Sequence, residues 1–201
     1  KRSLRVLDGA VVVFDGVAGV EPQSETNWRY ADEAMVPRIC FVNKLDRTGA
    51  SFEHSYKTIL DRLNKNAVRM QIPIGLEDQH EGVVDLLKMK AYYFEGAMGD
   101  HVTEKEIPEN LKADAEKYHA ELIEKIVEQD DTLMSEYLDG KIPSIDVLKA
   151  TMRKAVIANK IFPVFAGSAL KNKGVQLVLD AVVDYLPSPI DIPSIKGVDP
   201  E

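Results

Sequence analysis

The chain has 201 residues, of which 45% are hydrophobic and 29% are charged, and this composition excludes a disordered, collagen-like or disulfide-framed protein. Its net charge of −8 argues against broad contact with nucleic acid, which needs a basic face, so we expect no sequence-specific DNA binding. The single cysteine excludes an internal disulfide, and no apolar run approaches the ~20 residues of a membrane-spanning helix.

The first third of the chain alternates predicted strands with predicted helices. Residues 10–14 form a continuous apolar run rich in β-branched side chains, which predicts a strand buried on both faces. Helix formers fill residues 22–35, and that helix must end before Pro37 because the residue preceding a proline leaves the α region. Residues 38–42 predict a second buried strand, and residues 52–63 predict a second helix with one apolar face.

The middle of the chain does not follow this alternation. Residues 68–74, 82–87 and 91–95 predict short strands without helices between them. Helical spacing of apolar residues then recurs in three segments: residues 111–126, 131–138 and 144–159, the last with Ser144 as its N-cap. We therefore expect residues 68–160 to form a separate α+β unit inserted between two strands of the main sheet. This unit also carries the acidity, because residues 100–139 contain 13 acidic and 4 basic side chains.

The alternation returns after the inserted unit. Residues 161–165 predict a third core strand, and residues 175–186 predict a helix. The apolar face expected for that helix consists of Val175, Leu179, Val182, Val183 and Leu186. Such alternation is typical of a doubly wound α/β sheet, to which we assign residues 1–67 and 161–187. The prolines at residues 187–193 disfavour helix and central strand, so residues 188–201 are predicted to be a linker toward a further domain.

A polar tetrapeptide, Asn43-Lys44-Leu45-Asp46, follows the second predicted strand. It would lie at the carboxyl end of a parallel sheet, where open α/β folds bind ligands. The Asp46 carboxylate can accept two parallel hydrogen bonds from the N1 hydrogen and the exocyclic amine of guanine, whereas adenine carries a donor at its 6-position. The stem of Lys44 can cover the purine face, and the amide of Asn43 can hold the base edge and neighbouring loops. The alternative is an ordinary polar turn after a strand.

A second candidate loop, residues 166–170, follows the third predicted strand with the sequence Ala-Gly-Ser-Ala-Leu. Small residues let backbone N–H groups approach a ligand, so Ser168 can steady Asp46 and the Ala169 amide can donate to guanine O6. Gly-Ser-Ala alone is more typical of an ordinary strand-to-helix turn, but two such loops at adjacent strand ends predict a guanine site. The predicted contacts are Asn43, Lys44 and Asp46 on one loop and Ser168, Ala169 and Leu170 on the other.

Asn-Lys-x-Asp followed by Ser-Ala resembles the pair of base-recognition motifs of the translational GTPases. The segments at residues 2–10, 19–26, 42–47, 71–75 and 186–189 resemble the elongation factor G family, so that the resemblance covers nearly the whole chain. It implies the C-terminal portion of a P-loop GTPase doubly wound sheet, with the inserted α+β subdomain that this family calls G′ at residues 68–160.

The resemblance also implies a function. The family binds GTP and GDP with Mg²⁺ and hydrolyses GTP to drive translocation of tRNA and mRNA on the ribosome, in the cytoplasm or in an organellar matrix. G′ is a docking surface for the stalk protein of the large ribosomal subunit, which assigns that partner to the acidic insert of this chain. Two alternatives stay open: a sister translational GTPase, such as a ribosomal protection protein or peptide release factor 3, and an interaction module that binds no nucleotide.

Several parts of a GTPase are missing from the 201 residues. There is no Gly-x-x-x-x-Gly-Lys-Ser/Thr loop for phosphates, no preceding switch threonine for Mg²⁺, and no Asp-x-x-Gly with the histidine that follows it in this family. We therefore expect an excised piece of a longer protein that has no catalytic residue and no metal ligand of its own, binds GTP weakly and does not hydrolyse it. The histidines are scattered and predict no metal site: His54, His80, His101 and His119.

Overall fold

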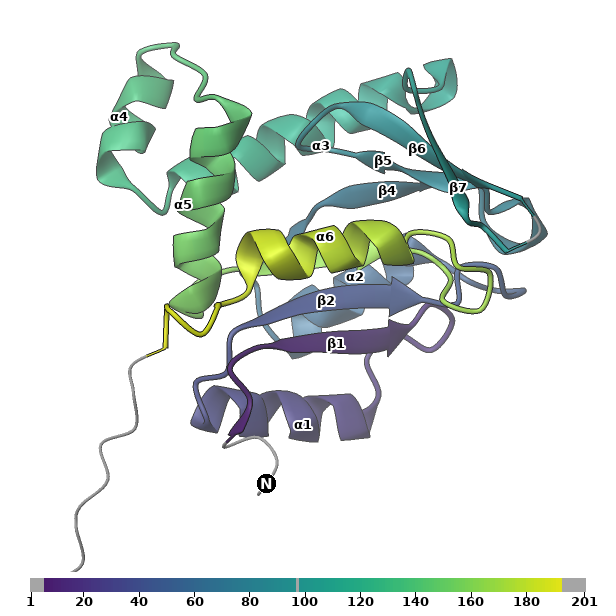
Figure 1. Ribbon diagram of the computed structural model, residues 1–201, viewed down its shortest axis with the longest axis horizontal. Coiled ribbons are helices and arrows are strands. Elements are labelled where there is room, and N and C mark those ends of the chain that lie inside the picture. Colours follow the sequence, from purple (N-terminus) through teal and green to yellow (C-terminus); the bar gives the residue numbers. More distant parts are fainter. Residues whose placement is uncertain (1–5, 97, 193–201) are drawn as a thin grey trace, which may run out of the picture.

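The structure is a computed structural model that describes residues 6–96 and 98–192, and these residues contain two β-sheets (Figure 1). The strands of the parallel sheet are, in spatial order, β1 (Ala10–Asp15), β2 (Arg38–Asn43), β8 (Phe162–Ala166) and β3 (Ala67–Arg69). The strands of the antiparallel sheet are β4 (Gln71–Ile74), β5 (Gly82–Asp85), β6 (Lys90–Glu95) and β7 (His101–Lys105). The accompanying helices are α1 (Pro22–Glu33), α2 (Phe52–Arg62), α3 (Glu109–Val127), α4 (Asp131–Leu138), α5 (Ile145–Ile157) and α6 (Val175–Tyr185). The predicted fold class, an α/β sheet with an inserted α+β part, is confirmed.

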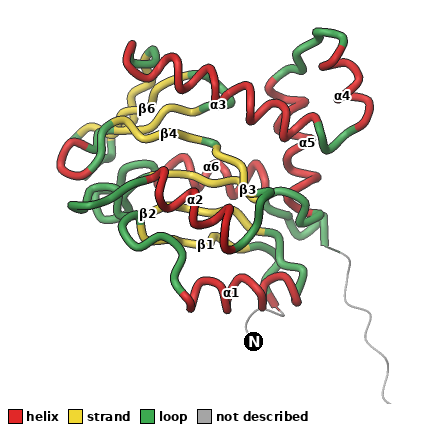
Figure 2. Tube along the Cα trace, turned by 180° about the vertical axis from the view of Figure 1, so that it is seen from behind, coloured by secondary structure: helices red, strands yellow, loops and turns green. Residues whose placement is uncertain are grey.

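Helices cover both faces of the parallel sheet. Helix α6 lies on one face and α2 on the other, as the two opposite views show (Figures 1 and 2). Strand β2 divides its side chains between them: Ile39 and Phe41 pack with residues of α6, whereas Cys40 and Val42 pack with residues of α1 and α2. Because successive side chains of a strand point to opposite faces, a strand covered on both sides needs a continuous apolar run.

Strand β1 and helix α6 bury less apolar surface than their sequences predict. Val11 and Val13 of β1 are 38% and 55% exposed, because β1 is the edge strand of the described sheet and has only β2 beside it. Leu179 and Val183 of α6 are 61% and 77% exposed. The most buried side chains of the helix are Val178, Ala181 and Tyr185. The prediction that β1 is buried on both faces was wrong, and the predicted face of α6 was wrong for Leu179 and Val183, whereas Val175, Val182 and Leu186 do pack against the core. Apolar residues surround most of α6, so periodicity alone does not select its buried face.

The strand predicted over residues 68–74 is in fact two strands in different sheets. Strand β3 pairs in parallel with β8, and β4 pairs antiparallel with β5. Met70 lies between them, where its N–H donates to Val164 O at 3.0 Å and its carbonyl accepts from Leu86 N at 3.0 Å. The prediction of one strand was wrong because the chain changes sheets at Met70 without a glycine or proline to mark the break.

The antiparallel sheet and α3 lie on the β8–β3 side of the parallel sheet, away from β1, and α5 packs against β2 (Figure 1). One cluster of buried side chains joins Phe41 of β2, Leu122 of α3 and Met152 of α5. Helix α5 also packs along α6. It begins where predicted, because Ser144 Oγ accepts from Val147 N at 3.4 Å and caps the helix. The insert is therefore anchored to the sheet that holds the candidate loops.

Parts of two predictions lie outside the described residues. The predicted linker over residues 188–201 is described only to residue 192, and the segment at residues 2–10 only from residue 6. The boundaries of the inserted unit, residues 68–160, stay a prediction. Within the described part of the chain, the helices are too short or too polar to cross a membrane.

Candidate functional site

The two candidate loops meet at one edge of the parallel sheet. Strands β2 and β8 are neighbours, with Val42 opposite Ala166, so the loops that follow them start side by side. The side-chain oxygen Asn43 Oδ1 accepts hydrogen bonds from two backbone groups, Lys44 N at 2.7 Å and Ala169 N at 2.8 Å. Asn43 thus joins the two loops through its own side chain, which is the convergence that the sequence predicts.

Asp46 and Asn43 each have a side-chain polar atom that makes no hydrogen bond to the described residues. Asp46 Oδ1 is buried and has no hydrogen-bond partner among the described residues. A buried acceptor left without a donor costs about 1–3 kcal/mol, and a charged one costs more. Asn43 Nδ2 also makes no hydrogen bond within the described part of the chain. The site therefore offers a carboxylate acceptor and an amide donor to a ligand.

Ser168 is engaged in the turn that follows β8 and not with Asp46 as predicted. It is fully buried, and its backbone N–H and carbonyl pair with Lys173 O and Lys173 N, both at 2.9 Å. Its Oγ accepts from Lys171 N at 3.2 Å, and among the described residues it makes no hydrogen bond to Asp46. The turn is tight, because a side chain at Gly167 would lie 2.2 Å from Lys173 O.

Ala169 and Leu170 form the exposed part of the second loop. The Ala169 N–H, predicted to donate to guanine O6, donates to Asn43 Oδ1 instead. Leu170 is 83% exposed and lies outside the buried clusters. A contact between the Ala169 amide and a base would therefore require exchange of the bond to Asn43.

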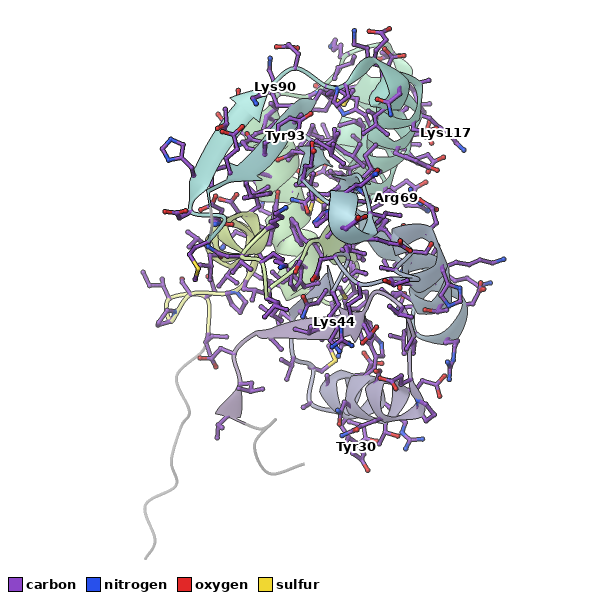
Figure 3. The ribbon with its side chains drawn as sticks, turned by 90° about the vertical axis from the view of Figure 1, so that its right-hand side faces the viewer. Tyr30, Lys44, Arg69, Lys90, Tyr93 and Lys117 are labelled. Atoms are coloured by element: carbon purple, nitrogen blue, oxygen red, sulfur yellow. The ribbon has the colours of Figure 1, made fainter. Side chains whose placement is uncertain are left out.

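Lys44 is held by Asp15, a residue whose role the sequence interpretation missed. Lys44 has φ +66 and its Nζ donates to Asp15 Oδ2 at 2.7 Å. Figure 3 looks onto this edge of the sheet, where Lys44 is labelled. The hydrogen bond from Lys44, together with those from the Val17 and Ala18 amides, lowers the pKa of Asp15 to about 2, against the effect of burial. The position of Asp15 at the carboxyl end of β1 was the available signal, since Asn43 ends β2 at the same edge.

A third turn, the 3-10 segment Glu77–Gln79, braces the first loop. Glu77 N donates to Leu45 O at 2.8 Å, and Glu77 Oε1 accepts from Gly49 N at 2.7 Å. The next residue, His80, is only 1% exposed. This turn carries no motif in the sequence, so only the tertiary structure brings it to the site.

A cavity of about 660 Å³ lies away from these loops, between α2, β3 and α3, and none of the six predicted base contacts lines it. Arg69 is on its wall, with its guanidinium 3.7 Å from the ring centroid of Tyr118 (Figure 3). The described residues contain no group of three or more His, Cys, Asp or Glu side chains that could hold a metal ion. The cavity is therefore not the predicted base site, which lies at the edge where the two candidate loops meet.

Comparison with known proteins identifies the family and several relatives of the chain. The family model of the elongation factor Tu GTP binding domain matches residues 1–188. The chain belongs to this family. Elongation factor G 1 of Bdellovibrio bacteriovorus is 54% identical over 202 aligned residues, which cover 100% of this chain and 29% of that protein. A crystal structure of a protein from Thermus thermophilus matches with a TM-score of 0.85 and 27% identity, covering 94% of this chain and 28% of that one.

The chain thus spans less than a third of each of these relatives, and the predicted resemblance to elongation factor G is confirmed. Membership of the elongation factor Tu GTP binding domain family implies a guanine nucleotide as ligand. The chemistry of the loop edge fits the base of that nucleotide, because within residues 6–96 and 98–192 no donor reaches Asp46 Oδ1 and no acceptor reaches Asn43 Nδ2.

Proposed function

We propose that this chain is the guanine-recognition part of a GTPase of the elongation factor G type. One observation carries the proposal: Asn43 Oδ1 bridges Lys44 N and Ala169 N, which joins the loop that carries Asp46 to the loop after β8. Open α/β sheets bind ligands at this edge. A bound GTP would supply the phosphoanhydride bond whose hydrolysis drives the activity proposed for the whole protein.

Each polar residue of the first loop has a separate role in this proposal. Asp46 accepts from the N1 hydrogen and the exocyclic amine of guanine, and each such charge-assisted hydrogen bond contributes about 1.5–3 kcal/mol. Asn43 Nδ2 donates to an acceptor on the base edge. The stem of Lys44, held at its end by Asp15, lies along the purine face. Ser168, Ala169 and Leu170 shape the second wall, with the Ala169 amide held by Asn43.

The activity proposed for the whole protein is GTP hydrolysis coupled to ribosomal translocation of tRNA and mRNA, in the cytoplasm or an organellar matrix. Its partner is the ribosome, and the acidic face around α3 is the proposed contact for the stalk protein. This chain alone is expected not to hydrolyse GTP, because its sequence lacks the P-loop and switch motifs that bind phosphate and Mg²⁺. Those contacts supply the transition-state stabilisation.

Saturation-transfer NMR on the 201-residue chain tests base recognition, since it detects weak ligands at millimolar concentration. We expect transfer to the guanine H8 proton of GDP, competition by guanosine, and no competition by ADP. The alternative of an interaction module without nucleotide binding predicts no transfer to base protons. That result, with a chain shown to be folded by its amide spectrum, would contradict the proposal.

The variant Asp46→Asn tests the role of the carboxylate more sharply. An amide can donate to the 2-oxo group of xanthine, where a carboxylate can only accept, so preference should move from GDP toward xanthosine diphosphate. The matched control is Asp78→Asn, on the 3-10 turn, which should keep the preference for GDP. Unchanged preference in Asp46→Asn would remove Asp46 from the site.

A further inference from the structure

A buried histidine follows the turn that braces the candidate site. His80 is 1% exposed, and its ring Nδ1 lies 3.2 Å from the carbonyl oxygen of Gly75. Because a carbonyl can only accept, Nδ1 carries the hydrogen of this bond. In the neutral ring Nε2 then carries no hydrogen and can only accept, and it is buried without a partner among the described residues.

The segment that carries His80 is bonded to both candidate loops. Glu77 N donates to Leu45 O at 2.8 Å, one residue before Asp46, and Gly49 N donates to Glu77 Oε1 at 2.7 Å. On the other side, Lys173 Nζ donates to the carbonyl of His80 at 2.5 Å. The histidine is therefore fixed between the loop after β2 and the turn after β8.

Charges from both loops act on the His80 ring. Burial lowers the pKa of His80 most, and the Lys173 ammonium lowers it further. The carbonyl of Gly75 and the carboxylate of Asp46 act in the opposite direction and raise that pKa. Asp46 and Lys173 are thus the charged side chains, one from each loop, that act on the ring in opposite directions.

Asp46 Oδ1 and His80 Nε2 are thus two buried atoms without a partner in the described part of the chain, on segments that are hydrogen-bonded to each other. Both are acceptors while the ring is neutral, so neither can satisfy the other. A proton on Nε2 changes this, because the imidazolium becomes a donor and bears a charge opposite to that of the carboxylate. The proton comes from solvent, and no other group changes its bonding.

We propose that His80 is a positioning residue for Asp46, whose neutral ring leaves the carboxylate free to accept from guanine and whose imidazolium holds Asp46 Oδ1 in the interior. The inference rests on the proposed function, because it concerns the residue that would select the base. Recognition of the N1 hydrogen and the amine requires both carboxylate oxygens. An Asp46 oxygen that accepts from His80 is therefore not available to accept from guanine.

The sign of the pH effect follows from linkage. Guanine binding draws Asp46 away from His80 and so disfavours the imidazolium, which means that protonation of His80 must weaken binding by the same factor. Since burial lowers the pKa of His80 from its usual 6.5, the loss should begin below pH 6.5. We expect the affinity for GDP to fall further in the wild type than in a variant without Nε2 as the pH is lowered below 6.5, with the difference growing by at most about tenfold for each pH unit below the pKa of His80.

Two substitutions separate the nitrogen atoms of the ring. In His80→Asn, the amide nitrogen replaces Nδ1 and can still donate to Gly75 O, while nothing replaces Nε2, so the extra loss at low pH should vanish. In His80→Gln, the amide nitrogen can replace Nε2 as a permanent donor, so GDP binding should be weaker at pH 7.5 as well. His101→Asn, on the exposed strand β7, is the matched control and should keep the wild-type pH profile. The phosphates of GDP titrate equally for all variants, so the ratio of affinities isolates the histidine.

The experiment combines this series, measured by saturation transfer from the 201-residue chain to GDP, with a ¹⁵N NMR titration of the His80 ring without nucleotide. In the titration, Asp46→Asn should lower the pKa of His80 by about half a pH unit or more, because it removes the negative charge. An unchanged pKa of His80 in Asp46→Asn overturns the pairing, whatever the nucleotide data show. Equal pH profiles of wild type and His80→Asn overturn it as well. Absence of GDP binding at every pH instead contradicts the proposed function and with it the effect on binding, while the ring titration still decides whether His80 and Asp46 are paired.

Discussion

The parallel and antiparallel sheets differ in how their strands meet water. All five residues of β8 are buried, and β2 exposes part of only its last residue, Asn43. In β7, at the edge of the antiparallel sheet, four of five residues are exposed. A strand packed on both faces cannot move its ends, so the loops after β2 and β8 start from fixed positions. The difference explains why the candidate site lies on the parallel sheet and the charged surface on the insert.

The ion pairs of the two regions differ in the same way. Arg38 of β2 is fully buried, forms an ion pair with Asp32 and lies 4.2 Å from the ring centroid of Trp28. Lys105 of β7 pairs with Glu95 at 3.0 Å, but half of each side chain is exposed. Water and salt screen the second pair, whereas removing a partner from the first leaves a buried charge. Equal numbers of ion pairs would therefore contribute unequally to stability in the two regions.

The largest expected effect comes from the core of the parallel sheet. Phe162 of β8 is 1% exposed and packs edge-on against Trp28, with ring centroids 4.9 Å apart. We expect Phe162→Ala to lower the free energy of unfolding by about 3–5 kcal/mol, because it leaves a cavity in a packed core. Leu138→Ala, at the end of α4 where the side chain is 74% exposed, should change it by only about 0.5 kcal/mol or less. Similar losses in urea unfolding would contradict the contrast between the two regions.

The strands of the parallel sheet could be predicted closely from the sequence, and those of the insert less well. Strand β2 is one residue longer than its predicted range of 38–42, because an apolar run bounded by Pro37 and a polar turn has little freedom. Strand β7 was not predicted, since its side chains are mostly charged or polar and its pairing with β6 decides its conformation. The break between β3 and β4 also depends on which strand pairs with each of them, and no local sequence pattern indicates this pairing.

The candidate site shows the same limit. The two loops could be placed together from the sequence, because carboxyl ends of parallel strands share an edge. The bond from Ala169 N to Asn43 Oδ1, and the use of Ser168 Oγ within its own turn, depend on side-chain geometry that a motif does not contain. Asp15 was missed although it ends β1 at the same edge of the sheet as Asn43, whereas His80 follows a turn without a motif, and only the tertiary structure brings its carbonyl to Lys173 Nζ.

A second prediction concerns the junction of the two regions, where Arg69 joins α2 to α3. Arg69 is 9% exposed, its Nη2 lies 2.9 Å from Glu53 Oε2, and its guanidinium lies 3.7 Å from the ring centroid of Tyr118. Arg69→Ala should lower the free energy of unfolding by about 2–3 kcal/mol, through loss of a charge-assisted hydrogen bond and of a desolvated cation–π contact. Urea unfolding measures the change.

Lys105 provides the matched control, since it has the same kinds of contact in an exposed setting. Its Nζ lies 3.0 Å from Glu95 Oε1 and 4.7 Å from the ring centroid of Tyr93. Lys105→Ala should cost at most about 1 kcal/mol, and less at high salt. If the two substitutions cost the same, burial is not what distinguishes the regions.

A third, smaller effect should depend on pH. The hydrogen bond from Lys44 lowers the pKa of Asp15 from 3.8 to about 2, so the ionised form stabilises the fold above pH 4 and this contribution is lost as pH falls toward 2. Because the pair is partly exposed, we expect about 1 kcal/mol. Asp15→Asn should lower the free energy of unfolding by that amount at pH 7 and by much less at pH 2.5. Equal losses at both pH values would show that the charge of Asp15 is not responsible.

The smallest effect lies in the insert, where two helix caps differ in strength. Asp130 caps α4 by accepting from Thr132 N at 3.0 Å and Leu133 N at 3.1 Å, whereas Ser144 caps α5 with a single bond of 3.4 Å. Asp130→Ala should cost about 1 kcal/mol and Ser144→Ala about half of that, because a carboxylate with two donors also favours the positive end of the helix dipole. Amide hydrogen exchange should locate each loss in the capped helix and leave β2 and β8 protected. Faster exchange in β8 of the Asp130→Ala variant would mean that the insert and the parallel sheet unfold together as one unit. The two regions would then differ in the exposure of their side chains but not in their local stability.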